Sequence, residues 1–576
     1  MATAMGWQKP DNVAGSSAPA IMVGLFVATG GVLFGYDTGT INGILAMESF
    51  KDHFNSGYRD DDGNLNMSPR EVSLIVAMLS AGTVLGALLA APCGDQWGRR
   101  WALIGAIGVF CIGAILQVCA ENVATLTVGR GVAGIGVGTV SVLVPLYQSE
   151  MAPKWVRGTL VCAYQLSITF GLLIAAVVNI LTKAIDGAAA YRIPMGLQIS
   201  WACVLALGLL FLPETPRYLI KRGYKEAAAL SLSRLRRLDI THPALIEELA
   251  EIEANHEYEM ALGSDTYKDV FVGQPHLGRR LLTGCGLQML QQLTGVNFIM
   301  YYGTTFFNGA DIPDPFKITL IIQVINCVST LPGLVVVESW GRRRLLIVGA
   351  IGMAICQLLI ASYATASGDD NGTVQNQILI IFVAIYIFFF AASWGPVVWV
   401  VTSEIYPLKV RAKSMSISTA SNWLLNFAIA YATPFMVDTK NVDKQGGSVN
   451  LGARVFFVWG AFCIVAIAFV WCMVFETSKI SLEQIDEMYE RVDHAWNSRK
   501  FEPSWSFQQM RDFGFSDSGI PPTEPQLELQ PSRASSASTS QSDAGANASA
   551  GATATAAANT QEAKMLAQLG HVDLSY

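Results

Sequence analysis

The amino-acid sequence predicts an all-α membrane protein with twelve transmembrane helices, arranged as two pseudo-symmetric six-helix halves joined by a short helical linker. The chain has 576 residues, of which 52% are hydrophobic and 14% are charged, whereas a soluble domain carries roughly 25% charged residues. Apolar runs of about 20 residues, the length needed to cross a bilayer, recur along most of the chain. Three short motifs also occur twice in the same order, which indicates an internal duplication.

Each long apolar run predicts one transmembrane helix, because the hydrocarbon core of a bilayer is about 30 Å thick. In chain order, the twelve expected spans are 21–45, 72–93, 101–120, 125–147, 159–182, 195–212, 281–307, 317–337, 345–366, 377–402, 413–437 and 455–475. The first run lacks the flanks of a cleaved signal peptide, so we expect it to stay in the protein as its first span.

The spans and the polar stretches between them define five segments. These are an N-terminus (1–20), a first half (21–212), a linker with amphipathic helices (213–280), a second half (281–475) and a tail (476–576). An Ala/Ser/Thr/Gly-rich run predicts that the tail is disordered from about residue 530, since such a composition cannot bury enough apolar area to fold.

Basic residues near the ends of the spans predict the orientation of the chain. They gather in alternate short loops, which share one side with the linker and both termini: Arg99, Arg100, Lys154, Arg157, Arg342, Arg343, Arg344, Lys409, Arg411 and Lys413. We expect this side to be the cytoplasm and the membrane to be the plasma membrane. Glycosylation sequons at Asn66 and Asn371 lie in loops on the other side, although Pro69 makes use of the first less favourable.

Composition also excludes several classes of function. The ten cysteines form no C-x-x-C pair and the six histidines lie outside the apolar runs, so no metal or other cofactor is expected. A net charge of −7 gives no reason to expect a nucleic-acid partner. No span carries a nucleophile beside a base or a phosphate-binding loop, and small residues at 131–138 are typical of helix packing. The chain is therefore not expected to be an enzyme.

The duplicated motifs place acids and arginines at corresponding helix ends. Asp95-Gln-Trp-Gly-Arg-Arg100 recurs as Glu338-Ser-Trp-Gly-Arg-Arg343, Ser149-Glu150 as Ser403-Glu404, and Glu214-Thr215 as Glu476-Thr477. We expect ion pairs between helices within each half, which would latch the halves together in one conformation. The alternative is that the arginines only anchor the orientation. The expected latch residues are Asp95, Arg99, Arg100, Glu150, Arg157, Glu338, Arg342, Arg343, Glu404 and Arg411.

With these motifs, the sequence resembles the sugar porters of the major facilitator superfamily. Further matching motifs are Phe34-Gly-Tyr-Asp-Thr-Gly39, Arg130-Gly131, Pro145-Leu-Tyr147, Pro213-Glu-Thr-Pro-Arg217 and Gln291-Gln-Leu-Thr-Gly-Val-Asn297. Among these porters it is most similar to monosaccharide transporters of filamentous fungi, which include a glucose transporter and sensor type linked to sporulation control. The resemblance implies the major facilitator fold and transport of glucose or other hexoses, with xylose as a further candidate substrate.

A sugar is neutral and rich in hydroxyl groups, so a selective site needs amides and aromatic faces rather than charges. The spans supply Gln288, Asn426 and Trp423, and the resemblance implies direct ligands at Gln165, Gln291, Gln292, Asn297, Asn326, Trp399 and Asn422. A helix break at Gly295 would turn Asn297 toward Gln292. For each amide, the alternative is a hydrogen bond that only joins two helices.

Asp37 and Arg130 are opposite charges within spans, where a charge costs about 2.5–3.5 kcal/mol. They are expected to pair, either as a static link between helices or as the site that couples sugar to proton transport. We favour symport; facilitated diffusion and a glucose sensor that signals through the tail to a cytoplasmic partner remain alternatives. The expected partners are thus a monosaccharide, protons and the lipid bilayer.

Overall fold

A computed structural model describes residues 14–58, 66–153, 156–261, 266–273, 276–309, 314–366, 373–437, 454–478, 480 and 482–501. All of them belong to Met1–Phe507, one of two compact units into which the chain divides. The described residues form helices and contain no β-strand. This result confirms the all-α prediction.

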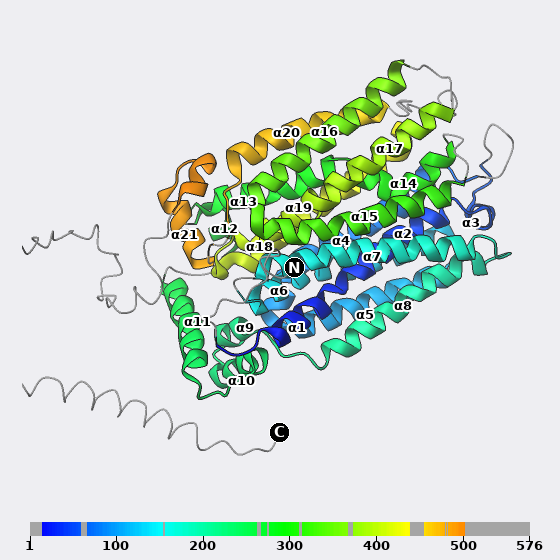
Figure 1. Ribbon diagram of the computed structural model, residues 1–576. Helices are drawn as coiled ribbons and strands as arrows, with labels where there is room; N and C mark the ends of the chain where they lie inside the picture. Colours follow the sequence, from blue (N-terminus) through cyan, green and yellow to red (C-terminus); the bar gives the residue numbers. More distant parts are fainter. Residues whose placement is uncertain are drawn as a thin grey trace, which may run out of the picture. The chain divides into compact units, whose positions relative to one another are not determined.

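The helices of the first part of the chain run back and forth in one bundle (Figure 1). They are α1 (Ala18–Ala28), α2 (Gly30–Ile44), α3 (Glu48–Phe54), α4 (Pro69–Trp97), α5 (Arg99–Val118), α6 (Val123–Met151), α7 (Arg157–Thr182) and α8 (Ala189–Leu209). Ser68 begins α4 with a capping box, in which its side chain and that of Glu71 satisfy each other's backbone N–H groups.

Four further helices follow: α9 (Pro216–Lys221), α10 (Lys225–Arg236), α11 (Pro243–Ala261) and α12 (Tyr267–Val272). The remaining elements are α13 (Leu277–Leu293), α14 (Val296–Gly309), α15 (Pro315–Trp340), α16 (Arg342–Ala366), α17 (Thr373–Phe389), η2 (Phe390–Trp394), α18 (Gly395–Glu404), α19 (Leu408–Val437), α20 (Val455–Met473), α21 (Leu482–Arg491) and η4 (Ala495–Lys500). Helices α9–α12 and α21 lie at one end of the bundle, which we call the linker end, and α3 lies at the other end (Figure 1).

Within the described residues, ten helical segments are long and apolar enough to cross a membrane. Helices α1 and α2 form one of these segments, and α17, η2 and α18 contribute another. The predicted seventh and eleventh spans coincide with α13–α14 and α19, which are not among the ten. Helices α13 and α14 have 17 and 14 residues because the chain breaks between them, so neither is long enough alone. Helix α19 is long enough, but polar residues such as Asn422 and Asn426 lower its apolar content.

Small residues allow helices of the first part to pack so closely that their main chains are in contact. Helix α4 packs along α6, where a Cβ atom at Gly82 or Gly134 would meet the main chain of the other helix. The residues at 131–138 are thus a helix-packing surface, as predicted, in which close approach replaces large apolar contacts.

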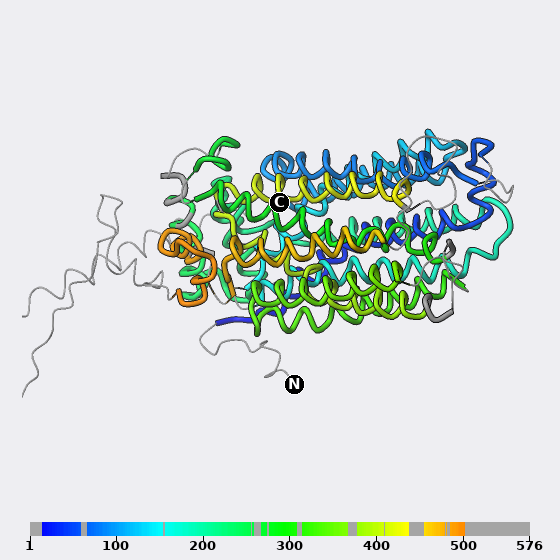
Figure 2. Tube along the Cα trace, turned by 90° about the horizontal axis from the view of Figure 1, so that it is seen from above, coloured from blue at the N-terminus to red at the C-terminus, as the bar shows by residue number. Residues whose placement is uncertain are grey.

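Two helix pairs join the earlier spans to the later ones. Helix α4 packs against α19, and α7 packs against α15. Seen from above, α19 lies beside the blue helices of the first part (Figure 2). A sliding or rocking motion between the two parts would therefore act mainly on these two contacts.

Helix α18 begins at Gly395-Pro396, and the residues before it depart from α-helical geometry. Proline lacks a backbone N–H, so an α-helical hydrogen bond is missing where α18 begins. The preceding residues, Phe390–Trp394, adopt a π-helical turn, a feature that often marks functional sites.

Candidate functional site

The predicted amides of α13 and α19 form one hydrogen-bonded group in the middle of the bundle. The Asn422 amide donates to Gln288 Oε1 at 2.7 Å and to Gln291 Oε1 at 2.9 Å. In return, Gln292 Nε2 donates to Asn422 Oδ1 at 2.8 Å. All four side chains are buried, so each amide must find a partner within the protein or in a bound ligand.

A helix break extends this group to α14. Helix α13 ends at Leu293 and α14 begins at Val296, with Gly295 at a φ of +84°. This break brings the Asn297 amide into a hydrogen bond with Gln292 Oε1. Gln292 Oε1 also accepts from Asn426 Nδ2 at 3.2 Å. We call Gln288, Gln291, Gln292, Asn297, Asn422 and Asn426 the amide network.

Two polar side chains that the sequence did not single out complete the network. Ser80 of α4 donates to Asn426 Oδ1 at 2.5 Å, and the Tyr301 hydroxyl donates to the same oxygen at 3.1 Å. Ser80 belongs to the earlier spans, whereas the network itself belongs to the later ones. Its small size and the absence of any motif around it left no signal in the sequence.

The two aromatic candidates, Trp399 and Trp423, lie on α18 and α19, which the amide network also contacts. Trp423 follows Asn422, and its indole N–H donates to Ser141 Oγ of α6 at 3.1 Å. Its ring packs edge to face with that of Phe34, with 4.8 Å between the ring centroids. The Trp399 ring lies 5.8 Å from that of Tyr164. Both tryptophans are buried, and their neighbours come from the earlier spans.

Gln165 and Asn326 lie outside the hydrogen bonds of the network. Gln165 of α7 is close to the backbone at Gly395, whose carbonyl oxygen accepts from Gln291 Nε2 at 3.1 Å. Asn326 donates to Gln323 Oε1 at 3.2 Å, and its own Oδ1 has no hydrogen-bond partner among the described residues. Gln323, which sequence reasoning missed, is one helical turn from Asn326 and is also buried.

Asp37 and Arg130 form the predicted pair. Arg130 Nη2 of α6 lies 3.3 Å from Asp37 Oδ2 of α2, and both side chains are almost completely buried. Removing either partner from such a pair leaves an uncompensated buried charge, at a cost of about 3–5 kcal/mol. The pair therefore changes greatly in energy when one member loses its charge.

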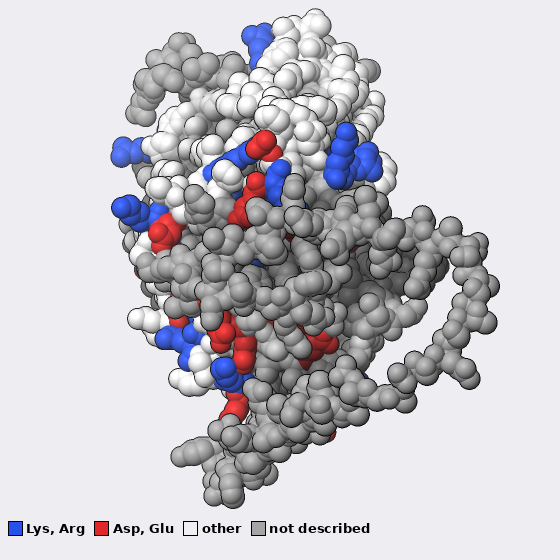
Figure 3. All heavy atoms as spheres, turned by 90° about the vertical axis from the view of Figure 1, so that its left-hand side faces the viewer, with Lys and Arg blue, Asp and Glu red and all other residues white. Residues whose placement is uncertain are grey.

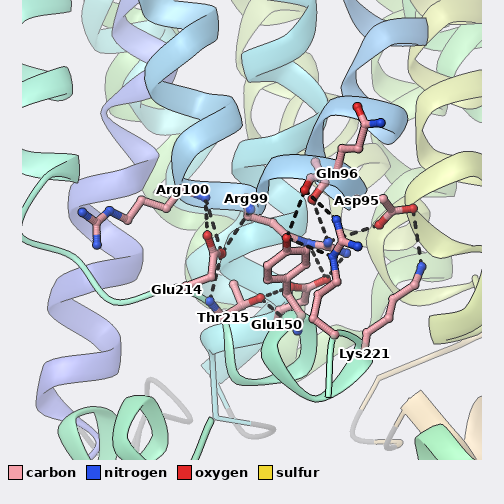
Figure 4. Close-up of polar contacts among 11 residues, drawn as sticks. Asp95, Gln96, Arg99, Arg100, Glu150, Glu214, Thr215 and Lys221 are labelled. Atoms are coloured by element: carbon pink, nitrogen blue, oxygen red, sulfur yellow. Dashed lines mark hydrogen bonds and ion pairs between the residues drawn. The ribbon is translucent and has the colours of Figure 1, made fainter. Parts of the chain in front are cut away.

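The first group of latch residues meets at the linker end (Figure 4). Arg99 at the start of α5 contacts Glu150 at 3.1 Å and Asp95 at 3.2 Å. The backbone N–H groups of Arg99 and Arg100 donate to the Glu214 carboxylate, each at 3.1 Å. Thr215 donates to Glu150 Oε2 at 2.6 Å. Burial raises the pKa of Glu214, which these backbone donors partly oppose.

The second group repeats this geometry with the duplicated residues. Arg342 contacts Glu404 at 2.9 Å and Glu338 at 2.8 Å. Its backbone N–H and that of Arg343 donate to the Glu476 carboxylate at 2.8 and 3.2 Å, and Thr477 donates to Glu404 at 2.7 Å. Burial raises the pKa of Glu476 as it does that of Glu214. In both networks, an arginine pairs with two acids, its backbone N–H and that of the next residue bind a third acid, and a threonine donates to the buried glutamate.

The remaining latch candidates are buried nearby. Arg157 lines a cavity of about 50 Å³ together with Glu150 and Arg236, and Arg411 Nε donates to the Tyr406 carbonyl at 3.0 Å. The start of α7 meets the second network, because a Cβ atom at Gly158 would contact Glu338 and Arg342. Viewed from the linker end, basic and acidic side chains occupy the same face (Figure 3).

The two candidate glycosylation sites differ in what the structure describes. Asn66 precedes α4, and its Oδ1 accepts from the Met67 N–H at 2.9 Å. The sequon hydroxyl, Ser68, is engaged as the cap of α4. Asn371 lies outside the described residues.

Comparisons with known proteins agree with this architecture. The family model described as "Sugar (and other) transporter" matches residues 23–489. The chain is 78% identical to the probable glucose transporter rco-3 of Neurospora crassa, over 92% of this chain and 89% of that protein. It is 40% identical to the high glucose sensor RGT2 of Saccharomyces cerevisiae, over 84% of this chain and 62% of the sensor.

Solved structures of the proton:xylose symporter XylE also match. The form bound to 6-bromo-6-deoxy-D-glucose has a TM-score of 0.70 at 26% identity and covers 82% of this chain and all of that chain. The inward-open form from E. coli has a TM-score of 0.61 at 25% identity, over 81% and 99%. These relatives are membrane proteins that carry or sense sugars rather than enzymes, which agrees with the prediction. The chain belongs to the sugar transporter family of the major facilitator superfamily.

Proposed function

We propose that the protein carries glucose and related monosaccharides across the plasma membrane by alternating access, with the sugar bound at the amide network. The observation that carries this proposal is a buried cluster of neutral amides whose partners come from both the earlier and the later spans. Neutral donors and acceptors suit the hydroxyls of a sugar, and a charged ligand would find no counter-charge within the network.

In the absence of sugar, the amides satisfy one another. A sugar would exchange these amide–amide hydrogen bonds for amide–hydroxyl bonds, so binding need not leave a buried polar group unpaired, which costs about 1–3 kcal/mol. Trp399 and Trp423 would pack on the apolar faces of the ring, Gln165 would contact it from α7, and Asn326 Oδ1 would gain the partner that it lacks.

We further propose twelve spans in two halves, 21–212 and 281–475, with the linker and both termini in the cytoplasm. Helices α13–α14 and α19 are then the seventh and eleventh spans, made polar by the sugar site. The repeated ion-pair networks support the duplication. The lower TM-score to the inward-open form of the symporter, 0.61 against 0.70 for the sugar-bound form, favours a state that is not inward-open.

Sugar:proton symport through Asp37 and Arg130 is our proposal for the driving force. Protonation of Asp37 would remove the charge that stabilises Arg130 and so weaken the link between α2 and α6. A proton that enters down 100 mV supplies about 2.3 kcal/mol, enough for roughly 50-fold accumulation. A facilitative carrier would use the same pair as a static link.

The experiment that tests this function measures uptake of radiolabelled glucose and xylose in a host without hexose carriers, with and without a proton uncoupler. We expect saturable glucose uptake that the uncoupler reduces. The 40% identity to a glucose sensor favours a second candidate, in which the same pocket signals through the tail. A pure sensor would give no uptake at normal surface abundance.

A further inference from the structure

The carbonyl oxygen of Thr294 is held by two side chains that do not belong to the amide network. Gln357 Nε2 of α16 donates to it at 2.7 Å, and the Tyr386 hydroxyl of α17 donates to it at 3.0 Å. Thr294, Gln357 and Tyr386 are each fully buried. Two side-chain donors from two helices therefore converge on a single backbone atom.

The break between α13 and α14 explains why this atom needs partners. In a continuous helix, the Thr294 carbonyl would accept from the N–H of Phe298. Here the Phe298 N–H donates to the Gly295 carbonyl instead, at 3.1 Å. The break thus frees the Thr294 oxygen inside the bundle, where no bulk water is at hand to satisfy it.

Gly295, the glycine of the break, packs against a third helix, α20. Gly295 has a left-handed backbone, which favours glycine. A Cβ atom at this position would overlap the Trp459 indole of α20. On the far side of Gln357, its Oε1 accepts from Cys463 of α20, with Sγ at 3.4 Å. Helices α16, α17 and α20 therefore surround the break.

The break lies directly between two members of the amide network. Gln292 is two residues before Thr294, and Asn297 is three residues after it. Their hydrogen bond requires the chain to turn at this point, because on a straight helix residues five apart lie about 140° apart. The conformation at Thr294–Gly295 therefore determines whether Asn297 faces Gln292 and Asn426.

We propose that Gln357 and Tyr386 are positioning residues of the sugar site, which fix the break through the Thr294 carbonyl and so place Asn297 toward the sugar. We call the two hydrogen bonds from Gln357 and Tyr386 to the Thr294 carbonyl the bracket. The inference rests on the proposed function for its sugar readout, but the bracket itself concerns the conformation of α13–α14. Neither side chain needs to touch the sugar. Both act from the side of the break where α16, α17 and α20 pack.

Tyr386→Phe removes only the hydroxyl group. Gln357→Met removes the amide donor but keeps a side chain of similar length. We expect each variant to raise the KM for glucose about five- to tenfold with at most about twofold change in kcat, because one of the two hydrogen bonds to the carbonyl is lost. Tyr191→Phe and Gln117→Met are matched controls, since Tyr191 Oη and Gln117 Nε2 are buried without a hydrogen-bond partner among the described residues. The controls should change KM by less than about twofold.

A double-mutant cycle separates positioning from a general packing defect. If Tyr386 acts by placing Asn297, then Tyr386→Phe should raise KM by less than about twofold when Asn297→Ala is already present. A full additional five- to tenfold loss in that background would overturn the proposal. So would an unchanged KM in the double variant Gln357→Met/Tyr386→Phe.

Hydrogen exchange distinguishes failure of this inference from failure of the transport proposal. In purified protein without sugar, the amides of residues 293–299 should exchange at least about fivefold faster in Tyr386→Phe and Gln357→Met than in the wild type and the two controls. Unchanged exchange would overturn the bracket, whatever the wild type transports. Faster exchange in a protein that moves no sugar would uphold the bracket and contradict only the proposed function.

Discussion

Gln292 and Asn422 carry the same functional group, a primary amide, which pairs within the protein here and which we propose also pairs with a sugar. Each amide offers donors and an acceptor, so a buried group of them can pair internally or pair with a hydroxyl-rich sugar. Gln292 uses both ends at once, since it donates to Asn422 and accepts from Asn297 and Asn426. Asn422 likewise bonds three members, Gln288, Gln291 and Gln292, so the loss of either residue disturbs half or more of the network.

Gln292→Ala and Asn297→Ala test the network directly. We expect each to raise the KM for glucose at least about fivefold, because a sugar hydroxyl or a neighbouring amide is left unpaired at a cost of about 1–3 kcal/mol. The measurement is the concentration dependence of labelled glucose uptake at equal surface abundance. Gln117→Ala, a buried glutamine of α5, is the control. Unchanged affinity in both variants would remove the network from the sugar site.

Asp37→Asn separates symport from facilitated diffusion. The variant cannot change its charge, so a symporter should lose uphill accumulation while it retains exchange of sugar across the membrane. We expect the remaining sugar uptake, which runs downhill, to be insensitive to an uncoupler. The control is Asp314→Asn, which removes the exposed pair with Lys317. If the wild type shows no sugar-evoked proton uptake, Asp37 and Arg130 are a static link instead.

At the scale of elements, the repeated ion-pair networks join helix ends rather than the two parts directly. Arg99 links α4, α5 and α6, and Arg342 links α15, α16 and α18. Each network therefore joins the ends of three helices at the linker end. The second network then presents Glu338 and Arg342 to the start of α7, so contacts within one part and with the other part are combined at the same residues.

Arg342→Gln and its counterpart Arg99→Gln should slow transport by similar factors. Each leaves buried carboxylates without their cation, which is costly for the closed state. We expect a loss of at least about tenfold in kcat with normal insertion, measured as uptake against surface abundance. Lys317→Gln, an exposed cation at the other end of the bundle, should have no effect. Full activity in both arginine variants would refute the latch.

The elements also show what the sequence could and could not predict. The break before Asn297 was predictable because a glycine marks it locally. The bracket on Thr294 was not, because Gln357 and Tyr386 lie in ordinary apolar runs and only the packing of distant helices brings them together. Gln323 and Ser80 were missed for the same reason. The motifs predicted the residues of the ion pairs, but not that the backbone N–H groups of Arg99 and Arg342 bind Glu214 and Glu476.

At the scale of the whole molecule, the described helices belong to one compact unit that ends at Phe507. This unit contains the amide network, the Asp37–Arg130 pair and both ion-pair networks. Transport should therefore need no residue beyond it, whereas a sensor would need the remainder of the chain to reach a partner. The two functions can be separated by truncation.

Removal of Gln508–Tyr576 should leave glucose uptake within about twofold of the full-length value, because the proposed sugar site and its supports are retained. Uptake in a carrier-null host measures transport, and glucose-dependent gene expression in the same cells measures signalling. Loss of signalling with normal uptake would assign a sensing role to the tail. A complete loss of uptake at normal surface abundance would contradict the assignment of transport to the first unit.

The central claim is that neutral side chains from both parts of the bundle bind a monosaccharide that then crosses the membrane. Counterflow of labelled glucose into liposomes that contain the purified protein tests it most directly. The account predicts that the wild type exchanges glucose and that Gln292→Ala/Asn297→Ala exchanges it at least about tenfold more slowly at low sugar concentration. A purified, folded wild-type protein that neither binds nor exchanges any monosaccharide would contradict it.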